Sequence, residues 1–231
     1  MRCDHQRVPL TPSPDIVLLD LDGTITDSYP GILRCLTLAL PSIDLEHLTE
    51  DQIRAFLGPP LHYTLGEVYG KSKQEIDDFV VVYRSHYFGG GEYEFELFPG
   101  MAGLIADLAS SAIKVGLATA KPIPSAERVL TKAELIHHFD FVGGSDMELT
   151  RQDKPSILSF TIENIGGLIT DGDNKNIVMV GDRKEDIIGA KHHRFTSIGA
   201  AWGYADEGEL IDAEPDFIVH SADELRALLL P

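Results

Sequence analysis

Short apolar segments alternate with helix-like stretches beyond residue 98, and this alternation restricts the possible folds more than any other feature. Four apolar runs rich in β-branched residues stand at Lys114–Ala120, Asn176–Asp182, Thr196–Trp202 and Asp216–His220. Stretches with helical spacing lie between or beside them, at Met101–Ala112, Ser125–Leu135, Pro155–Ile165, Glu185–His192 and Ala222–Leu229. Such alternation predicts βαβ units around a parallel sheet, and continuous apolar runs indicate burial on both faces. We therefore predict an α/β fold, a Rossmann-like doubly wound sheet, with a further strand at Asp15–Asp20.

Residues 29–97 have a different, helical pattern. The longest helical stretch repeats apolar residues at i, i+3, i+4, i+7 and i+11 from Ile76 to Tyr87, which marks one face of a helix. Pro30 and Pro60 suit the first turn of a helix. We predict a small all-helical module at 29–97, inserted into a core of residues 15–28 and 98–231. The glycines at Gly89–Gly91 are typical of a loop or of a hinge.

The acidic composition disfavours several classes of partner. The chain has 19 Lys and Arg against 37 Asp and Glu, a formal net charge of −18. We therefore expect no binding to nucleic acid or anionic membranes, which attract proteins chiefly through Lys and Arg. No apolar run approaches the roughly 20 residues that cross a membrane. A site for an anionic substrate needs a local cluster of positive charge against this general field.

The N-terminal residues 1–14 are predicted to form a flexible leader. Three prolines stand between Val8 and Pro14, and no apolar segment typical of a signal peptide is present. Cys3 and Cys35 provide no disulfide framework, which favours a reducing, cytoplasmic location. The sequence leaves open whether the protein is a monomer or a homodimer.

Two acids stand at the end of the first apolar run. Ile16–Leu19 leads into Asp20, and Asp22 and Gly23 follow. Ligands of an open parallel sheet bind outside the carboxyl ends of its strands, and side chains two residues apart lean to the same side. Two carboxylates about 4 Å apart repel by roughly 4 kcal/mol at an effective dielectric of about 20. The pair is thus either a plain acidic turn or part of a site with compensating cations; Ile25 stands where an EF-hand loop has its glycine, which excludes that loop.

Three other segments place polar side chains where further strands of the same sheet should end. Thr119 and Lys121 follow one apolar run, and Asp182 and Asp186 follow another. Lys154 directly precedes a predicted helix. Each residue alone has an ordinary structural explanation, but their joint occurrence favours one shared site at the edge of the sheet.

These segments resemble the four motifs of the haloacid dehalogenase-like hydrolase superfamily. The order D-x-D-G-T, T, K, G-D-x-x-x-D matches it from residue 15 onward, with a helical cap inserted after the first motif. The stretches DLDGTITDSYPGI, FLGPP, ELFPGM and VGDRKEDIIGAK look most similar to its phosphoglycolate phosphatase-like branch. One position departs from the pattern, because Ala120 stands where the second motif usually has Asn or Ser.

The resemblance implies a role for each matching residue. Asp20 would be the nucleophile that forms an aspartyl-phosphate, and Asp22 the general acid and base. Asp20, Asp182 and the main-chain carbonyl of Asp22 would hold one Mg²⁺. The expected phosphate-binding positions are Asp20, Gly23, Thr24, Thr119, Ala120 and Lys154. The expected supporting residues are Asp186, Lys121 and Arg183, of which Asp186 would orient Lys154 or a metal-bound water.

The implied activity is Mg²⁺-dependent hydrolysis of a small phosphorylated metabolite. Phosphoglycolate is the first substrate class to consider, and nucleoside 5′-monophosphates are the main alternative. A phosphomutase uses the same two acids, whereas a dehalogenase lacks the second, and a non-enzymatic binding protein needs neither. Asp27 is either a helix cap or a site residue, and we favour the cap. Trp202 and Tyr204 either line a wall near the site or pack in the core, and we favour core packing.

Overall fold

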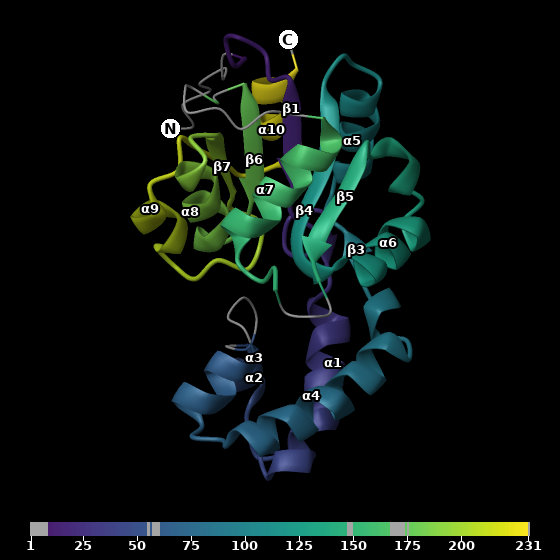
Figure 1. Cartoon of the computed structure of the whole chain (residues 1–231), viewed down its shortest axis with the longest axis vertical. Helices are drawn as coiled ribbons and strands as arrows, with labels where there is room; N and C mark the ends of the chain where they lie inside the picture. Colours follow the sequence, from purple (N-terminus) through teal and green to yellow (C-terminus); the bar gives the residue numbers. More distant parts are fainter. Residues whose placement is uncertain are drawn as a thin grey trace, which may run out of the picture. The chain divides into compact units, whose positions relative to one another are not determined.

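In the described part of the chain, six parallel strands form the central sheet, in the order β5-β4-β1-β6-β7-β8 (Figure 1). The computed structural model describes residues 9–54, 56, 61–146, 150–166, 174 and 176–230. The strands are β1 (Ile16–Leu19), β4 (Lys114–Pro122), β5 (Phe141–Ser145), β6 (Ile177–Gly181), β7 (Thr196–Ala200) and β8 (Phe217–Val219). Every adjacent pair in the sheet is parallel. The predicted α/β parallel sheet is thereby confirmed.

Helices flank this sheet and bury it on both faces. They are α5 (Met101–Ala109), α6 (Ile123–Lys132), α7 (Lys154–Ile165), α8 (Lys184–His192), α9 (Glu209–Ala213) and α10 (Ala222–Leu229). Leu18 packs with Ile157 and Leu158 of α7 in the core on one side of the sheet. Val17 and Leu19, which alternate with Leu18 along β1, are also fully buried. Both faces are therefore covered, as the continuous apolar runs predict.

Some predicted elements differ from the observed ones. The helix expected at Met101–Ala112 ends at Ala109, and the one expected at Ser125–Leu135 spans Ile123–Lys132. β5 and α9 were not predicted from the sequence. The strand β5 contains Gly143 and Gly144, and glycine weakens the strand signal. The helix α9 has five residues, too few for a helical repeat to be recognised.

By its internal contacts the chain divides into two units, Met1–Thr26 with Leu97–Pro231, and Asp27–Glu96. The bounds predicted for the inserted module, 29–97, lie close to those of the second unit. Short strands β2 (Thr26–Asp27) and β3 (Glu96–Leu97) pair where the chain passes between the units. The assignment of the first unit as a hydrolase core and the second as a cap stays a prediction.

The second unit is helical and has a core of its own. Its helices are α1 (Tyr29–Ala39), α2 (Glu50–Arg54), α3 (Leu61–Tyr63) and α4 (Lys73–Phe88). Ser72 and Glu75 form a capping box at the start of α4, which satisfies two N–H groups of its first turn. Phe79 of α4 is fully buried against Leu36 and Leu65. The predicted apolar face of the longest helix therefore builds this core.

The remaining terminal and cap predictions have mixed outcomes. Residues 1–8 of the expected leader, Pro60, and all of the FLGPP stretch except Phe56 lie outside the described residues. Within the leader, the Leu10 N–H donates to the Leu228 carbonyl oxygen at 2.9 Å. The Asp27 carboxylate accepts a hydrogen bond from the Tyr29 N–H at 3.2 Å, but the N-cap residue of α1 is Ser28, so Asp27 lies one residue before the cap position. Among the described helices, none combines the length and apolar character needed to cross a membrane.

Candidate active site

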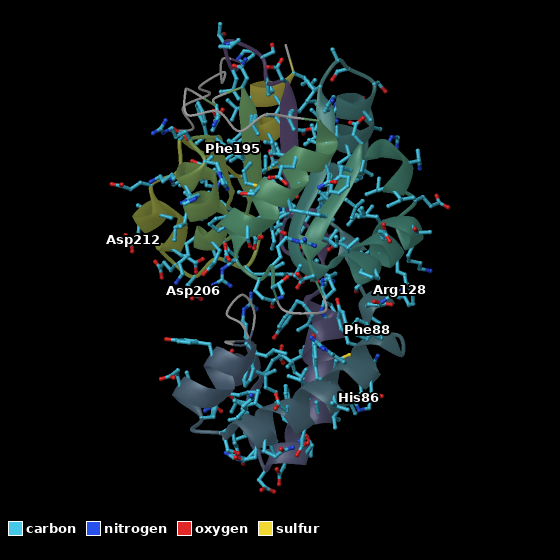
Figure 2. The ribbon with its side chains drawn as sticks, viewed as in Figure 1. His86, Phe88, Arg128, Phe195, Asp206 and Asp212 are labelled. Atoms are coloured by element: carbon cyan, nitrogen blue, oxygen red, sulfur yellow. The ribbon has the colours of Figure 1, made fainter. Side chains whose placement is uncertain are left out.

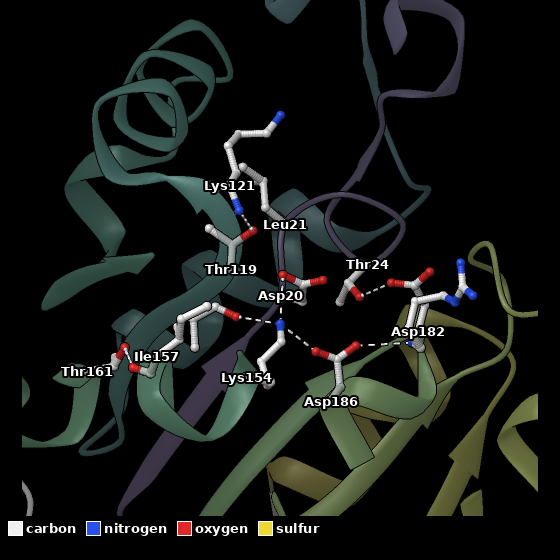
Figure 3. A network of polar contacts seen from close by, with 12 residues as sticks. Asp20, Leu21, Thr24, Thr119, Lys121, Lys154, Ile157, Thr161, Asp182 and Asp186 are labelled. Carbon is white, nitrogen blue, oxygen red and sulfur yellow. Dashed lines mark hydrogen bonds and ion pairs between the residues drawn. The ribbon is translucent and has the colours of Figure 1, made fainter. Parts of the chain in front are cut away.

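The carboxyl ends of three adjacent strands bring the predicted acids together. Asp20 follows β1, Thr119 lies near the end of the neighbouring β4, and Asp182 follows β6 on the other side. Lys154 and Asp186 come from the first turns of α7 and α8. Figure 3 shows these five side chains around one point at the sheet edge. The fold therefore brings these strand ends to one edge of the sheet, where a parallel topology binds ligands.

Lys154 lies at the centre of this cluster. Its Nζ is 3.2 Å from Asp20 Oδ1 and 2.5 Å from Asp186 Oδ1 (Figure 3). It also donates to the Ala118 carbonyl oxygen at 3.0 Å. Only 5% of the Lys154 side chain is exposed, so the two ion pairs form in a site with little water. Asp186 thus contacts Lys154 directly, and its expected role in orienting that lysine stays a prediction.

Burial and like charge raise the pKa values of Asp20 and Asp182, so their ionised forms need further cations. Burial raises the pKa of Asp20 from its ordinary 3.8 to about 6, although Lys154 opposes the shift. Burial also raises the pKa of Asp182 well above its ordinary value, with added repulsion from Asp186 and Asp20. For Lys154, burial lowers the pKa, but attraction to Asp186 and Asp20 is stronger and holds it above the ordinary range.

The acid cluster fits a divalent cation. One carboxylate oxygen from each of Asp20, Asp182 and Asp186 lies within 4.8 Å of the others. In the described part of the chain, Asp20 Oδ1 and Asp186 Oδ1 are buried without a hydrogen-bond partner, although both are in ion-pair range of Lys154. A hard-oxygen set of this kind is what Mg²⁺ prefers. The residues present therefore suit the expected magnesium site.

The loop after Asp20 serves Asp182 in this structure. The Thr24 hydroxyl donates to Asp182 Oδ1 at 3.0 Å, and the Thr24 N–H donates to the Leu21 carbonyl at 3.3 Å. The Gly23 N–H donates to the Thr26 carbonyl at 2.8 Å, and its φ of +85° is one that glycine adopts readily. Thr24 therefore supports Asp182, and the phosphate contacts expected of Gly23 and Thr24 stay predictions.

The segment after β4 contributes a second lysine. Lys121 Nζ lies 3.0 Å from Asp22 Oδ1, and its side chain is 5% exposed against 24% for Asp22. The Lys121 N–H donates to the Thr119 hydroxyl oxygen at 3.2 Å, which leaves the hydroxyl proton of Thr119 available for donation. Ala120 is exposed beside them. The expected supporting role of Lys121 therefore takes the form of a contact with Asp22.

Arg183 points elsewhere. Its guanidinium binds both carboxylate oxygens of Glu209, at 2.7 and 3.0 Å. The main-chain N–H of Arg183, by contrast, donates to Asp186 Oδ2 at 3.1 Å. Arg183 thus supports the site through its main chain, while its side chain ties α8 to α9.

Three residues after β7 contact the site, although we favoured core packing for Trp202 and Tyr204 and assigned no role to Gly203. The Tyr204 N–H donates to Asp182 Oδ2 at 2.8 Å, and the Trp202 indole N–H donates to the Thr24 carbonyl at 3.1 Å. A Cβ on Gly203 would lie 2.4 Å from the Gly23 carbonyl oxygen. One sequence signal could have identified these three residues. The stretch WGY stands at the end of an apolar run, as Asp20 and Asp182 do.

A Gly203→Ala variant is expected to lose about 1–3 kcal/mol of unfolding free energy, the usual result of overpacking. Its Cβ would stand 2.3 Å from Asp182 Cβ and 2.4 Å from a backbone oxygen, which cannot move like a flexible side chain. Urea denaturation measures the change. Gly103→Ala in α5 is the matched control, because its Cβ would have a nearest neighbour at 3.5 Å. Equal stability of the two variants would contradict the close approach.

Comparison with known proteins gives a consistent family. The model of the family described as haloacid dehalogenase-like hydrolase matches residues 17–200. Tyrosine-protein kinase PtkA of Mycobacterium tuberculosis is 33% identical over 94% of this chain and 73% of its own length. A solved PtkA structure has a TM-score of 0.78 at 31% identity, and the match covers 95% of this chain and 100% of that one.

Two relatives have names that denote phosphatase activity. A 5′-nucleotidase of Pseudomonas aeruginosa is 29% identical, and the match covers 92% of each chain. A phosphoglycolate phosphatase of Yersinia pseudotuberculosis is 27% identical, and the match covers 93% of each chain. Both align along nearly their full length, so the similarity includes the inserted helical unit as well as the sheet.

Proposed function

Because this chain belongs to the haloacid dehalogenase-like hydrolase family and is a phosphatase, we propose that it hydrolyses a small phosphate monoester through an aspartyl-phosphate on Asp20. The observation that carries the proposal is the position of Lys154, with its ammonium 3.2 Å from Asp20 Oδ1. A buried cation beside a carboxylate nucleophile can offset the charge of an incoming phosphate. Without it, the acidic field of the chain would repel that substrate.

In the first step Asp20 would attack phosphorus with a carboxylate oxygen. The bond between phosphorus and the leaving alcohol oxygen breaks, and Asp22 donates its proton to that oxygen. Asp22 stands two residues after Asp20, and 24% of its side chain is exposed to solvent. The Lys121 ammonium at 3.0 Å fixes the direction of the Asp22 carboxylate.

In the second step water would attack the phosphorus of the aspartyl-phosphate. Asp22 takes a proton from this water, the bond between phosphorus and Asp20 breaks, and phosphate leaves with the Asp20 carboxylate restored. Thr119 and Lys154 would hold the phosphoryl oxygens in both steps, through a hydroxyl proton and an ammonium group. The N–H of exposed Ala120 stays a predicted phosphate contact.

The acids would also hold Mg²⁺. We assign its binding to the carboxylates of Asp20 and Asp182 and to the main-chain carbonyl of Asp22, while Asp186 serves Lys154. When bound, Mg²⁺ supplies positive charge that offsets the acids and the phosphoryl oxygens. For Asp20 and Asp182 this assignment rests on the acid cluster and on their raised pKa values, and for the Asp22 carbonyl it rests on the family motif.

Addition of Mg²⁺ to the metal-free protein is expected to raise its Tm, and to raise it more above pH 6 than below. The pKa of Asp20 lies at about 6, above its ordinary 3.8. The folded metal-free chain therefore binds this proton more tightly than the unfolded chain does, and stability is lost as pH rises through that range. A bound cation offsets the cost of the buried Asp20 carboxylate anion, which causes this loss.

Thermal unfolding over a pH series, with and without Mg²⁺, measures the effect. Asp182→Asn is the variant that should lose the Mg²⁺ shift, and Asp212→Asn, an exposed acid on α9, should keep it. An unchanged Mg²⁺ shift in Asp182→Asn would place the cation elsewhere.

Phosphoglycolate and similar small acids are the substrate class that we propose first, with residues 27–96 selecting among them. A 5′-nucleotidase is the second candidate, favoured by the relative that matches 92% of this chain. Phosphate release from phosphoglycolate, nucleoside monophosphates and sugar phosphates separates the two. Interconversion of sugar phosphates without phosphate release would indicate a mutase, and transfer from ATP to tyrosine would indicate the activity named for PtkA.

A further inference from the structure

Glu209 is a half-buried acid whose carboxylate accepts four hydrogen bonds, and none of them comes from a residue that touches the reacting atoms. Its oxygens accept from the Arg183 guanidinium at 2.7 and 3.0 Å and from the Lys184 N–H at 2.9 Å. They also accept from the Asp206 N–H at 3.3 Å. Asp206 itself is exposed and lies at the surface (Figure 2), so it takes part through its main chain.

These partners belong to two segments that meet at the site. Arg183 and Lys184 directly follow Asp182, whereas Asp206 ends the loop 201–206. The start of the same loop donates to the site, through Tyr204 to Asp182 Oδ2 at 2.8 Å and through Trp202 to the Thr24 carbonyl at 3.1 Å. Glu209 therefore joins the segment that carries Asp182 to the loop that orients the Asp182 carboxylate.

The contacts of Glu209 are those of a fixed ionised group. Its side chain is 7% exposed and that of Arg183 is 13% exposed. Burial alone raises the pKa of Glu209, but the Arg183 hydrogen bonds outweigh it and hold the pKa below the ordinary value. A bidentate Arg–carboxylate pair adds directional specificity as well as energy. The loop is thus anchored at both ends.

We propose that Glu209 is a positioning residue for the magnesium site, which keeps the loop 201–206 on Asp182 and so fixes the Asp182 carboxylate in its binding orientation. This inference rests on the proposed function, because it takes Asp182 as a magnesium ligand. Outer residues that orient a metal ligand typically change metal affinity about 10- to 100-fold when they are replaced.

The test is calorimetric titration of Mg²⁺ into the full chain, alongside thermal unfolding of the metal-free protein. For Glu209→Gln, whose amide brings N–H groups toward the Arg183 guanidinium, we expect the Mg²⁺ Kd to rise about 10- to 100-fold. The kcat at saturating Mg²⁺ should stay close to that of the wild type. Trp202→Phe tests the other end of the loop without touching Glu209, and its Kd should rise in the same direction.

The matched control is Glu214→Gln, which makes the same charge change at the end of α9. Glu214 is 85% exposed and reaches Lys191 only at 3.9 Å, so its Mg²⁺ Kd should equal that of the wild type. A lowered Tm with an unchanged Mg²⁺ Kd in both Glu209→Gln and Trp202→Phe would show that these contacts only stabilise the fold. That result would overturn the positioning role of Glu209 and leave the proposed function standing. No Mg²⁺ binding by the wild type would overturn the proposed metal site together with it.

Discussion

The Asp20→Asn variant is expected to lose about 10⁴-fold or more in phosphatase kcat, the scale of removing a nucleophile. Asn has nearly the same shape as Asp, but its amide is too weak a nucleophile to form the acyl phosphate. Hydrolysis of p-nitrophenyl phosphate with Mg²⁺ measures the loss. The same assay on a phosphorylated alcohol would show whether the loss depends on the leaving group, which it should not.

The fold of Asp20→Asn should remain intact. Burial raises the pKa of Asp20 to about 6, so its ionised form destabilises the metal-free chain at neutral pH. A neutral amide avoids the cost of a buried carboxylate anion, and Lys154 keeps its ion pair with Asp186 at 2.5 Å. We expect the metal-free Tm to be unchanged or raised. Asp212→Asn controls for the charge change, and an Asp20→Asn enzyme as active as this control would end the aspartyl-phosphate mechanism.

The acids of the candidate site could be predicted from the residues next to them in the sequence. Asp20 and Asp182 end continuous apolar runs, and parallel strands that are buried on both faces must bring such ends to one edge. Lys154 and Asp186 were placed at the same edge by their positions beside a predicted helix and an apolar run, but a residue in the first turn of a helix carries no sign of which strand it faces. The ion pair between Lys154 Nζ and Asp186 Oδ1 at 2.5 Å forms because α7 and α8 lie side by side. That arrangement could not be predicted from the sequence.

What could not be predicted depends on contacts between distant segments. The Trp202 indole reaches the Thr24 carbonyl, and the Arg183 side chain turns to Glu209. No periodicity links positions so far apart in sequence. Gly23 and Thr24 match the family motif, yet their hydrogen bonds are taken within the loop or by Asp182. Motif spacing therefore predicted which residues would lie together, while their individual partners depend on the fold.

Lys154→Met is expected to remove about 3–5 kcal/mol of unfolding free energy, the typical result of removing one partner from a buried ion pair. Methionine has a similar length but leaves the Asp20 and Asp186 carboxylates without their cation. Both acids are nearly inaccessible to water. The loss should be largest above the pKa of Asp20, about 6, and should shrink as pH falls and the carboxylates take up protons. Urea denaturation of the metal-free chain across this range measures it.

The double variant Lys154→Met with Asp186→Leu separates stability from catalysis. Replacing both members of a buried pair by apolar groups of similar size is often neutral or stabilising, so most of the lost free energy should return. The kcat should stay at least about 10²-fold below that of the wild type, because the charge that would stabilise the phosphoryl oxygens is still missing. Recovery of activity together with stability would mean that Lys154 acts through folding alone. A single variant as stable as the wild type above the pKa of Asp20 would contradict the central ion pairs.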